Sequence, residues 1–385
     1  MEGPLMDFEL SDEQKALREA ARDALTRTNL IQAAHEMLDG KDGPDLWPTA
    51  REAGWTGLLV SEEHGGAGLG ALDAMLVFAE CGRVLAGIPL LGHVAATAIL
   101  DAAADAVGTE RLTAFADGEQ RAAYVGAAPP SDVEDGWTVD AARGMRRAPA
   151  PVAAVTDGEA EVTGEVAWVP DAPGADALVV VATSPDGPVA VLIDAGAEGV
   201  GVEAVQRYDA TRSLGHVKLD GGRGVVLDVG DATLAGAWYL ALGLIGAESL
   251  GSVERALEMS VEYAKERYTF GRAIGSYQAI KHGLVEALRM LENTRSLMYY
   301  AGWARQDAPG EFAVAACALR TAGGNALDYA SRELISVHGG IGATWEHDAP
   351  LFFRRAQLSR RLLGGTADAT DRVAGELLAS AAAAA

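Results

Sequence analysis

The chain changes its hydrophobic period twice, and these changes restrict the folds that it can adopt. Up to about residue 121, apolar residues such as Leu17, Ala21 and Leu25 recur at helical spacing. From 122 to 231 the apolar runs are short, and turn signals such as Asp157-Gly158 separate them. Beyond residue 231 the helical period returns. The sequence therefore predicts an α+β chain with an N-terminal helical domain (1–121), a small middle β-domain (122–231) and a C-terminal four-helix bundle (232–385).

Capping and turn residues give approximate boundaries for the elements. Ser11 and Gln14 form a capping-box pattern at the start of the first helix. The predicted strands are 161–164, 166–169, 177–182, 189–193 and 215–219. The predicted bundle helices are 232–267, 277–306, 311–338 and 349–378.

The charge and the cysteines exclude several classes of protein. The 55 acidic and 31 basic residues give a net charge of −24, which argues against a nucleic-acid partner and an anionic membrane surface. The two cysteines, Cys81 and Cys317, lie far apart and have neither a disulfide framework nor zinc-ligand spacing. We therefore expect a cytoplasmic protein without a metal site. The first residues lack a signal-peptide pattern, and the apolar runs are expected to be too short to span a membrane.

The segment from Arg267 to Gln278 combines residue types that suit a phosphorylated, ring-bearing ligand. The Arg267 guanidinium can pair with a phosphate, and Phe270 offers a flat apolar ring beside the turn residue Gly271. Gln278 places an amide at the start of the next helix. The alternative for this segment alone is a helix that ends at a Gly271 C-cap and carries an exposed arginine.

Two further segments, taken with this one, resemble the motifs of a known protein family. His338-Gly339-Gly340-Ile341-Gly342 is followed by 344–348 (TWEHD), and 62–70 (EEHGGAGLG) follows 53–58 near the start. In this order and spacing the chain resembles the acyl-CoA dehydrogenase flavoprotein family over nearly its whole length. The resemblance is most specific in the C-terminal third.

The resemblance implies FAD as the cofactor, clasped by two chains of a tetramer. In the family, the arginine of the RxxFG motif reaches the pyrophosphate of a flavin bound mainly by the neighbouring subunit, and the phenylalanine lies near the flavin. The glutamine contacts the adenine-dinucleotide part, and the glycine-rich segment passes against the phosphates. The cofactor residues implied here are Arg267, Phe270, Gly271, Gln278, His338, Gly339, Gly340, Gly342 and Thr366.

The middle of the chain matches the family poorly. A flavin-binding segment of the middle domain corresponds to 124–132 (YVGAAPPSD), which keeps a proline and a Ser-Asp pair but not the full motif. A family tryptophan near the flavin corresponds to Trp168, for which a place in the β-domain core is an equal alternative. The resemblance therefore supports the half of the flavin site that serves a neighbouring chain more strongly than the other half.

The family's catalytic glutamate is missing from both of its usual positions. The reaction removes a proton from the α-carbon of an acyl-CoA thioester, and a carboxylate must accept it. The expected positions hold Gly364 and, approximately, Ala241. Glu248 is a weak candidate for a relocated base, and Asp368 and Glu346 are weaker.

The resulting hypothesis is a base-lacking subunit of an acyl-CoA dehydrogenase, paired with a homologous chain in an α₂β₂ heterotetramer. Such paired enzymes occur in bacterial sterol side-chain degradation. A homotetramer is the alternative assembly, and an electron-transfer flavoprotein is the electron acceptor by family analogy. The alternative functions are a stand-alone FAD enzyme with a relocated base, a flavin-free structural subunit, and flavin-dependent oxygen chemistry.

Overall fold

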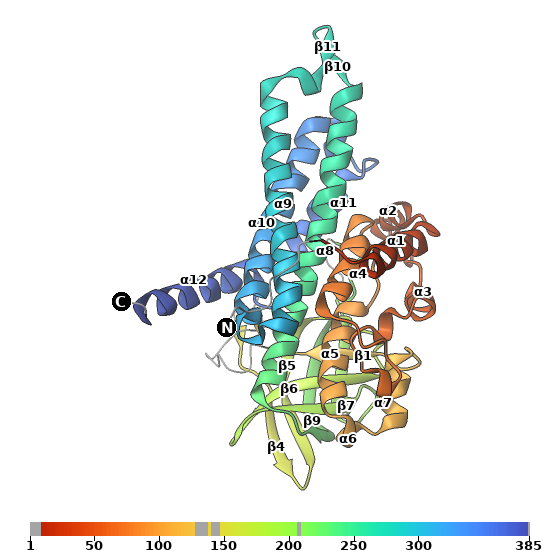
Figure 1. Ribbon diagram of the computed structural model, residues 1–385. Helices are drawn as coiled ribbons and strands as arrows, with labels where there is room; N and C mark the ends of the chain where they lie inside the picture. Colours follow the sequence, from red (N-terminus) through yellow and green to blue (C-terminus); the bar gives the residue numbers. More distant parts are fainter. Residues whose placement is uncertain (1–8, 128–137, 140–146, 206–208, 384–385) are drawn as a thin grey trace.

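The computed structural model describes residues 9–127, 138–139, 147–205 and 209–383. N-terminal helices, a central sheet and C-terminal helices follow one another along the chain, and the long C-terminal helices rise beyond the other two parts (Figure 1). The predicted fold class is confirmed.

The helices before the sheet build one continuous apolar core with the C-terminal helices. They are α1 (Asp12–Thr26), α2 (Leu30–Leu38), α3 (Trp47–Glu52), α4 (Ala71–Arg83), α5 (Leu90–Ala102), α6 (Ala104–Val107) and α7 (Thr109–Ala116). The predicted capping box is present at α1: Gln14 N–H donates to Ser11 Oγ at 3.2 Å, and Ser11 N–H donates to Gln14 Oε1 at 3.1 Å. Its two reciprocal bonds satisfy backbone donors that a helix start leaves open.

The central strands form a sheet that closes on itself. They are β1 (Ala122–Val125), β4 (Val152–Thr156), β5 (Glu159–Pro170), β6 (Ala177–Ser184), β7 (Gly187–Asp194), β8 (Val200–Ala204) and β9 (Leu214–Leu227). The pairing order is β1-β6-β4-β5-β9-β7, with β8 on β9, and β6 also pairs with β7. This last pairing joins β6, β4, β5, β9 and β7 into a ring around a separate apolar core.

The strand predictions were partly correct. β5 joins the predicted strands 161–164 and 166–169 into one, with register shifts along its pairing to β9. The pattern missed β1, β4 and β8, and also the short pair of β2 (Thr138–Val139) and β3 (Arg147–Ala148). β1 is buried at every position, so it lacks the alternation that marks a half-buried strand.

The C-terminal helices are α8 (Asp231–Glu266), α9 (Gln278–Asp307), α10 (Phe312–His338), α11 (Ala349–Ser359) and α12 (Gly365–Ala383). The prediction of one helix over 349–378 was wrong. Leu363, Gly364 and Gly365 have φ values of 48°, 78° and 78°, and this left-handed run separates α11 from α12.

Helix α8 is the central element of the fold. By length and composition it could cross a membrane, contrary to the expectation that no apolar run is long enough, but 89% of its most apolar window is buried inside the fold. It crosses α4 at very short range: a Cβ at Gly251 would lie 1.7 Å from the Ala79 carbonyl oxygen, and one at Gly82 would lie 1.9 Å from that of Glu248. Only glycine permits this crossing, which sets the N-terminal helices against the bundle.

Candidate functional site

A short β-hairpin with a two-residue turn extends the end of the bundle, where the chain passes from α8 to α9. Helix α8 ends at Glu266, and Arg267 is its C-cap. The strands β10 (Tyr268–Thr269) and β11 (Arg272–Ala273) then pair around Phe270 and Gly271, whose φ values are 48° and 80°. The alternative of a helix C-cap at Gly271 was therefore wrong, because Gly271 forms the hairpin turn. A turn with positive φ at both central residues matches the twist of the flanking strands.

The base of this hairpin is fixed, whereas its tip is exposed. Ile274 N–H donates to the Arg267 carbonyl at 2.7 Å, and the Tyr277 hydroxyl donates to the Thr269 carbonyl at 3.1 Å. Phe270 is 94% exposed, and the Arg267 side chain is also exposed. Gln278 begins α9 beside the hairpin, as predicted. An apolar ring so exposed at the end of a long projection is available to a ligand or another chain.

The glycine-rich segment turns back on α10, and its glycines have different roles. Gly339 has a φ of 64°, which favours glycine. A Cβ at Gly342 would lie 2.7 Å from both His338 Cβ and the Ile335 carbonyl oxygen, so the close return of the chain requires glycine there. Gly340 has a negative φ and open space around its Cβ position. Its own fold does not require glycine, so an approaching ligand is a reason for it.

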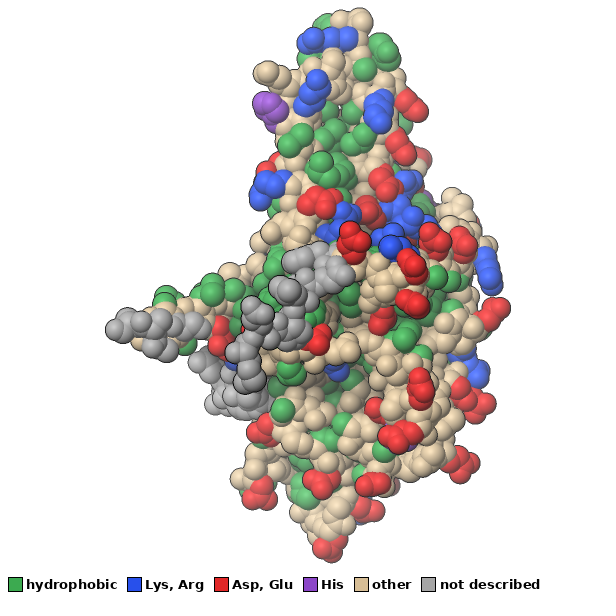
Figure 2. All heavy atoms as spheres, viewed as in Figure 1, with side chains coloured by type: hydrophobic (Ala, Val, Ile, Leu, Met, Phe, Trp, Pro, Cys, Tyr) green, Lys and Arg blue, Asp and Glu red, His purple; other side chains and the backbone are tan. Residues whose placement is uncertain are grey.

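The hairpin and the glycine-rich segment lie at the same end of the bundle. Arg267 N–H donates to the Tyr263 carbonyl at 2.8 Å, and the Tyr263 ring stacks on His338 at 4.1 Å between centroids. Lysines and arginines gather at this end in Figure 2, whereas acidic side chains dominate the lower part. We call 267–278 together with 338–342 the hairpin end. It brings together every predicted cofactor residue except Thr366.

Thr366 lies far from the hairpin end. It packs on α10, where a Cβ at Gly324 would lie 2.4 Å from Thr366 Cγ2. Gly324 precedes His338 by fourteen residues, about 21 Å along a helix at 1.5 Å per residue. Thr366 and the hairpin end of one chain therefore cannot contact the same phosphate.

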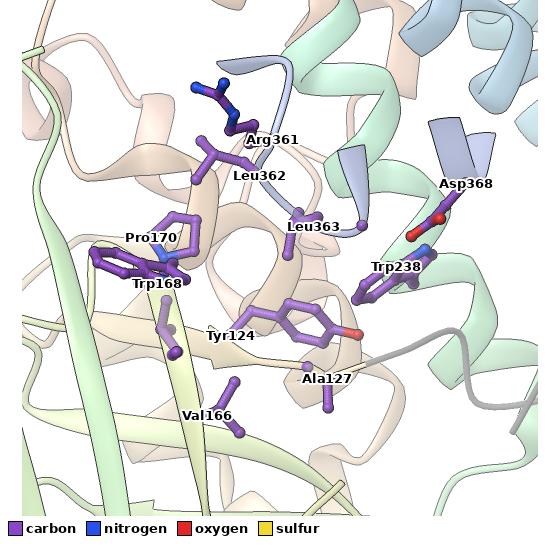
Figure 3. Close-up of a pocket in the computed structure, with 14 residues that line it drawn as sticks. Tyr124, Ala127, Val166, Trp168, Pro170, Trp238, Arg361, Leu362, Leu363 and Asp368 are labelled. Atoms are coloured by element: carbon purple, nitrogen blue, oxygen red, sulfur yellow. The ribbon is translucent and has the colours of Figure 1, made fainter. Parts of the chain in front are cut away.

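A cavity of about 90 Å³ lies between the sheet, α8 and the start of α12 (Figure 3). Its aromatic lining consists of Tyr124 from the end of β1, Trp168 from β5 and Trp238 from α8. The remaining lining residues are Gly126, Ala127, Val166, Ala167, Val169, Pro170, Arg361, Leu362, Leu363, Gly364 and Asp368. Gly364 thus lines a cavity at the point where the resemblance expects a catalytic glutamate.

Asp368 is the one carboxylate that lines this cavity among the described residues. A Cβ at Gly364 would lie 2.7 Å from Asp368 Oδ2. The Asp368 carboxylate therefore occupies the space in which a side chain at 364 would begin.

Trp168 lines the cavity from a strained position. Its φ is 61°, within a register shift of β5, and its ring packs edge-on against His216 at 4.4 Å. A non-glycine residue held in such a region costs on the order of 1–3 kcal/mol, and such strain concentrates at functional sites. The cavity therefore explains Trp168 better than a place in the closed β-core. Residues 128–132 of the poorly matched flavin segment lie outside the described residues.

Ala241 and Glu346 do not line the cavity. Ala241 is buried in α8 with 1% exposure, as expected of a core residue. Glu346 is exposed, and hydrogen bonds from its own backbone and from Thr344 lower the pKa of its carboxyl. A lowered pKa makes a carboxylate a weaker base.

Glu248 belongs to a buried ion-pair cluster, which we call the Arg355 cluster. Arg355 NH1 donates to Glu248 Oε1 at 2.6 Å and Arg355 Nε donates to Asp209 Oδ2 at 2.7 Å. Arg212 pairs with the other Glu248 oxygen, and Thr211 Oγ1 accepts from Arg355 NH2 at 2.6 Å. Burial opposes the ionisation of Asp209, but the charges of Arg355 and Arg212 and the hydrogen bond from Thr211 together outweigh burial and keep the pKa of the carboxyl below its ordinary value. Both oxygens of Glu248 are thus engaged by arginines.

The Arg355 cluster joins the three parts of the molecule. Glu248 comes from α8, Arg355 from α11, and Asp209 and Arg212 from the segment before β9. Arg355 NH2 also donates to the Leu85 carbonyl after α4 at 3.3 Å. The sequence analysis missed this cluster and the cavity. A signal for the cluster was present, because Arg355 sits inside the apolar run of α11, where an unpaired charge is costly.

Comparison with known proteins places the chain in a family. The acyl-CoA dehydrogenase N-terminal domain model matches residues 11–124, and the acyl-CoA dehydrogenase C-terminal domain model matches residues 243–378. The acyl-CoA dehydrogenase IpdE2 of Mycobacterium tuberculosis is 31% identical over 369 residues, which cover 95% of this chain and 98% of IpdE2.

Solved structures share the fold over nearly the whole chain. The Tcur3481–Tcur3483 steroid ACAD, solved as a variant, superposes with a TM-score of 0.83 at 27% identity, covering 97% of this chain and 99% of that one. The ChsE4–ChsE5 complex of Mycobacterium tuberculosis gives a TM-score of 0.83 at 24% identity, with the same coverage. Sequence and fold agree: this chain belongs to the acyl-CoA dehydrogenase family of FAD-dependent oxidoreductases.

Proposed function

We propose that this chain supports the FAD-dependent α,β-desaturation of an acyl-CoA thioester as the base-lacking partner in a heterotetramer with a homologous chain. The observation that carries the proposal is Gly364. It lines the cavity where the family places its glutamate, and neither backbone nor space there favours a longer side chain. The buried Ala241 leaves the second family position without a carboxylate as well.

The chemistry explains the need for a partner. Desaturation removes a proton from the α-carbon and a hydride from the β-carbon of the thioester, and the flavin supplies the hydride acceptor when bound. Loss of a positioned general base lowers the rate on the order of 10²–10⁴-fold. A homologous chain that keeps the glutamate would remove this defect and would also provide the acyl-CoA pocket.

The hairpin end suits the phosphates of a dinucleotide cofactor. Its features are an exposed guanidinium at Arg267, an exposed ring at Phe270, and open space around the backbone of Gly339 and Gly340. Arginine pairs with phosphate in a planar, two-point geometry, and bare backbone N–H groups can approach phosphate oxygens closely. We propose that these residues, together with Gln278, contact an FAD molecule that is held mainly by the partner chain.

The cavity of this chain does not fit a flavin ring. A site for a small-molecule ligand usually occupies on the order of 300–1,000 Å³, whereas this cavity measures about 90 Å³. The ring of Tyr124 folds over Gly126, where a Cβ would lie 2.6 Å from the Tyr124 hydroxyl oxygen. The chain's own side chains thus fill space that a ring would need, which favours an assembly with one FAD for each pair of chains.

The last helix supports an assembly of chains. Helix α12 leaves the body of the molecule (Figure 1), and Leu377 and Leu378 near its end are 62% and 72% exposed. In proteins, most of the stability of a helix comes from packing its apolar side chains against other surfaces. A homologous chain is the favoured partner, since the related steroid ACAD is named for two components, Tcur3481 and Tcur3483. A homotetramer is the alternative. By family analogy, a cytoplasmic location and an electron-transfer flavoprotein as acceptor complete the proposal.

Co-expression with a homologous acyl-CoA dehydrogenase chain that has the glutamate tests this proposal. We expect a complex of two chains of each kind, FAD in half the molar amount of total chains, and desaturase activity absent from this chain alone. A lone chain that binds a full equivalent of FAD and oxidises a thioester would overturn the proposal. A complex without flavin absorption would instead establish the structural-subunit alternative. Ring-bearing acyl-CoA thioesters are the first substrates to test, because the Tcur3481–Tcur3483 relative is described as a steroid ACAD.

Asp368 favours a second candidate, a stand-alone enzyme with a relocated base. Its Oδ2 lies beside the Cβ position of residue 364, closer to the expected site of the base than Glu248, which two arginines engage. If this candidate is correct, the lone chain should show activity that Asp368→Asn lowers on the order of 10²-fold or more. The exposed Asp371→Asn is the matched control on the same helix and should keep full activity.

A further inference from the structure

Three aromatic side chains in ring-to-ring contact connect the two parts of the hairpin end. The His338 ring lies between Tyr263 of α8, at 4.1 Å and 27° between planes, and His347 from the segment before α11, at 4.3 Å and 53°. Tyr263 also accepts the N–H of Arg267 through its carbonyl at 2.8 Å. The same residue therefore anchors the arginine by its backbone and the glycine-rich segment by its ring.

Hydrogen bonds fix the role of Nδ1 in both imidazoles. The Nδ1–H of His338 donates to the Leu334 carbonyl at 2.8 Å, because a carbonyl oxygen can only accept. His347 has the opposite arrangement, since its Nδ1 accepts the N–H of Ala349 at 3.0 Å. His347 must therefore be neutral at Nδ1 for the start of α11 to keep this bond.

The surroundings of His347 disfavour its charged form. Burial and the neighbouring His338 of α10 lower the pKa of His347, and His35 of α2 acts in the same direction. Asp348, next in the chain, opposes the shift but is itself bonded to His35, with 2.9 Å between His35 Nε2 and Asp348 Oδ1. A positive charge at the N-terminal end of α11 would also face the unfavourable end of the helix dipole.

We infer that Tyr263, His338 and His347 are positioning residues that hold the glycine-rich segment at a fixed distance from Arg267, and that this arrangement requires a neutral His347. The inference rests on the proposed function, in which both parts grip one FAD pyrophosphate. Protonation of His347 breaks the hydrogen bond from Ala349. The glycine-rich segment is then no longer held in its position against α10. The grip on FAD then weakens as the pH falls.

The direction of the pH effect follows from the lowered pKa. A histidine whose folded pKa lies below its ordinary value of 6.5 takes up its proton less readily when folded. The arrangement is therefore complete above pH 6.5 and loses stability progressively as the pH falls through and below that value. Acidification should not strengthen the grip at any pH in this range.

The test measures both the histidine and the cofactor. Histidine NMR of this chain alone, with the His347 signal assigned by its loss in His347→Asn, should show His347 titrating below pH 6.5. In the heterotetramer, FAD retention should fall with pH over the same interval. His347→Asn should remove this dependence, because the Asn oxygen can accept the Ala349 N–H but does not titrate. His282→Asn, an exposed histidine on α9 near the same end, is the matched control and should keep the wild-type profile.

Tyr263 gives an independent check at neutral pH. Tyr263→Phe should retain FAD affinity, whereas Tyr263→Leu should weaken it roughly 2- to 10-fold, the range of an aromatic pair. Titration of His347 at or above pH 6.5, or an unchanged pH profile of FAD retention in His347→Asn, overturns the inference. If Arg267→Ala leaves FAD affinity unchanged while the His347 titration is as expected, the proposed function has failed and the stacked arrangement stands.

Discussion

Replacing Glu248 by Gln separates a structural carboxylate from a catalytic one. The side chain is 7% exposed, and both of its oxygens pair with arginines of the Arg355 cluster. The amide has the same shape but no charge, so among the described residues of the Arg355 cluster Asp209 remains as the paired carboxylate of the arginines. Removing one partner of a buried ion pair costs about 3–5 kcal/mol. We expect a loss of this size in the free energy of unfolding.

The loss should appear as a lower melting temperature. Unfolding entropy is about 2.1 cal/mol/K per residue, which for 385 residues gives about 0.8 kcal/mol/K. The melting temperature should therefore fall by about 4–6 °C in calorimetry, with a parallel shift in urea unfolding. Activity of the proposed heterotetramer should change little at temperatures below the unfolding transition.

The control is Glu286→Gln, which breaks the exposed pair with Arg289 on α9. Pairs of this kind contribute at most about 1 kcal/mol, so its melting temperature should shift by about 1 °C or less. An unchanged melting temperature in Glu248→Gln, together with a fall in turnover on the order of 10²-fold or more, would refute this reasoning and identify Glu248 as the base.

Three further substitutions test other parts of the molecule. Gly364→Glu should destabilise the lone chain by roughly 1–3 kcal/mol, because residue 364 has a φ of 78° and Asp368 Oδ2 lies 2.7 Å from the new Cβ. The variant should not gain desaturase activity, and measurable turnover would contradict this prediction. Burial raises the pKa of Asp171 to about 6 against a hydrogen bond from Gly92, so stability should rise as the pH falls through 6. Asp171→Asn should accordingly be more stable than the wild type by roughly 1–3 kcal/mol at pH 8 and lose this advantage near pH 4, as urea unfolding at the two pH values would show. Arg267→Lys should lower the FAD affinity of the heterotetramer by roughly 10-fold or more, because an ammonium cannot form the two-point contact with phosphate; equilibrium dialysis measures it, and equal affinities would remove Arg267 from the site.

Local chemistry made part of this structure predictable. Ser11 and Gln14 satisfy each other's neighbouring backbone groups without help from the rest of the fold, so the capping box could be identified from four residues. The grouping of Arg267 with the glycine-rich segment came instead from the family resemblance. No periodicity indicates that the ends of α8 and α10 meet through the rings of Tyr263 and His338.

Long-range contacts decided the features that the sequence analysis missed. The break at Leu363–Gly365 lies within a run whose apolar spacing suits a continuous helix, and two adjacent glycines were the available signal. The role of Glu248 depends on Arg212, thirty-six residues earlier, and Arg355, more than one hundred later. Such pairings depend on the tertiary packing that a single sequence does not reveal.

The Arg355 cluster stabilises the fold at positions that differ from those of the family's catalytic base. The joint among α8, α11 and the segment before β9 uses none of the positions where the family keeps its proton acceptor. A chain with this fold can therefore lack a carboxylate at position 364 and still keep the ion pairs that join its parts. Mutational loss of a catalytic group and loss of the fold are therefore separate events in a chain that is built this way.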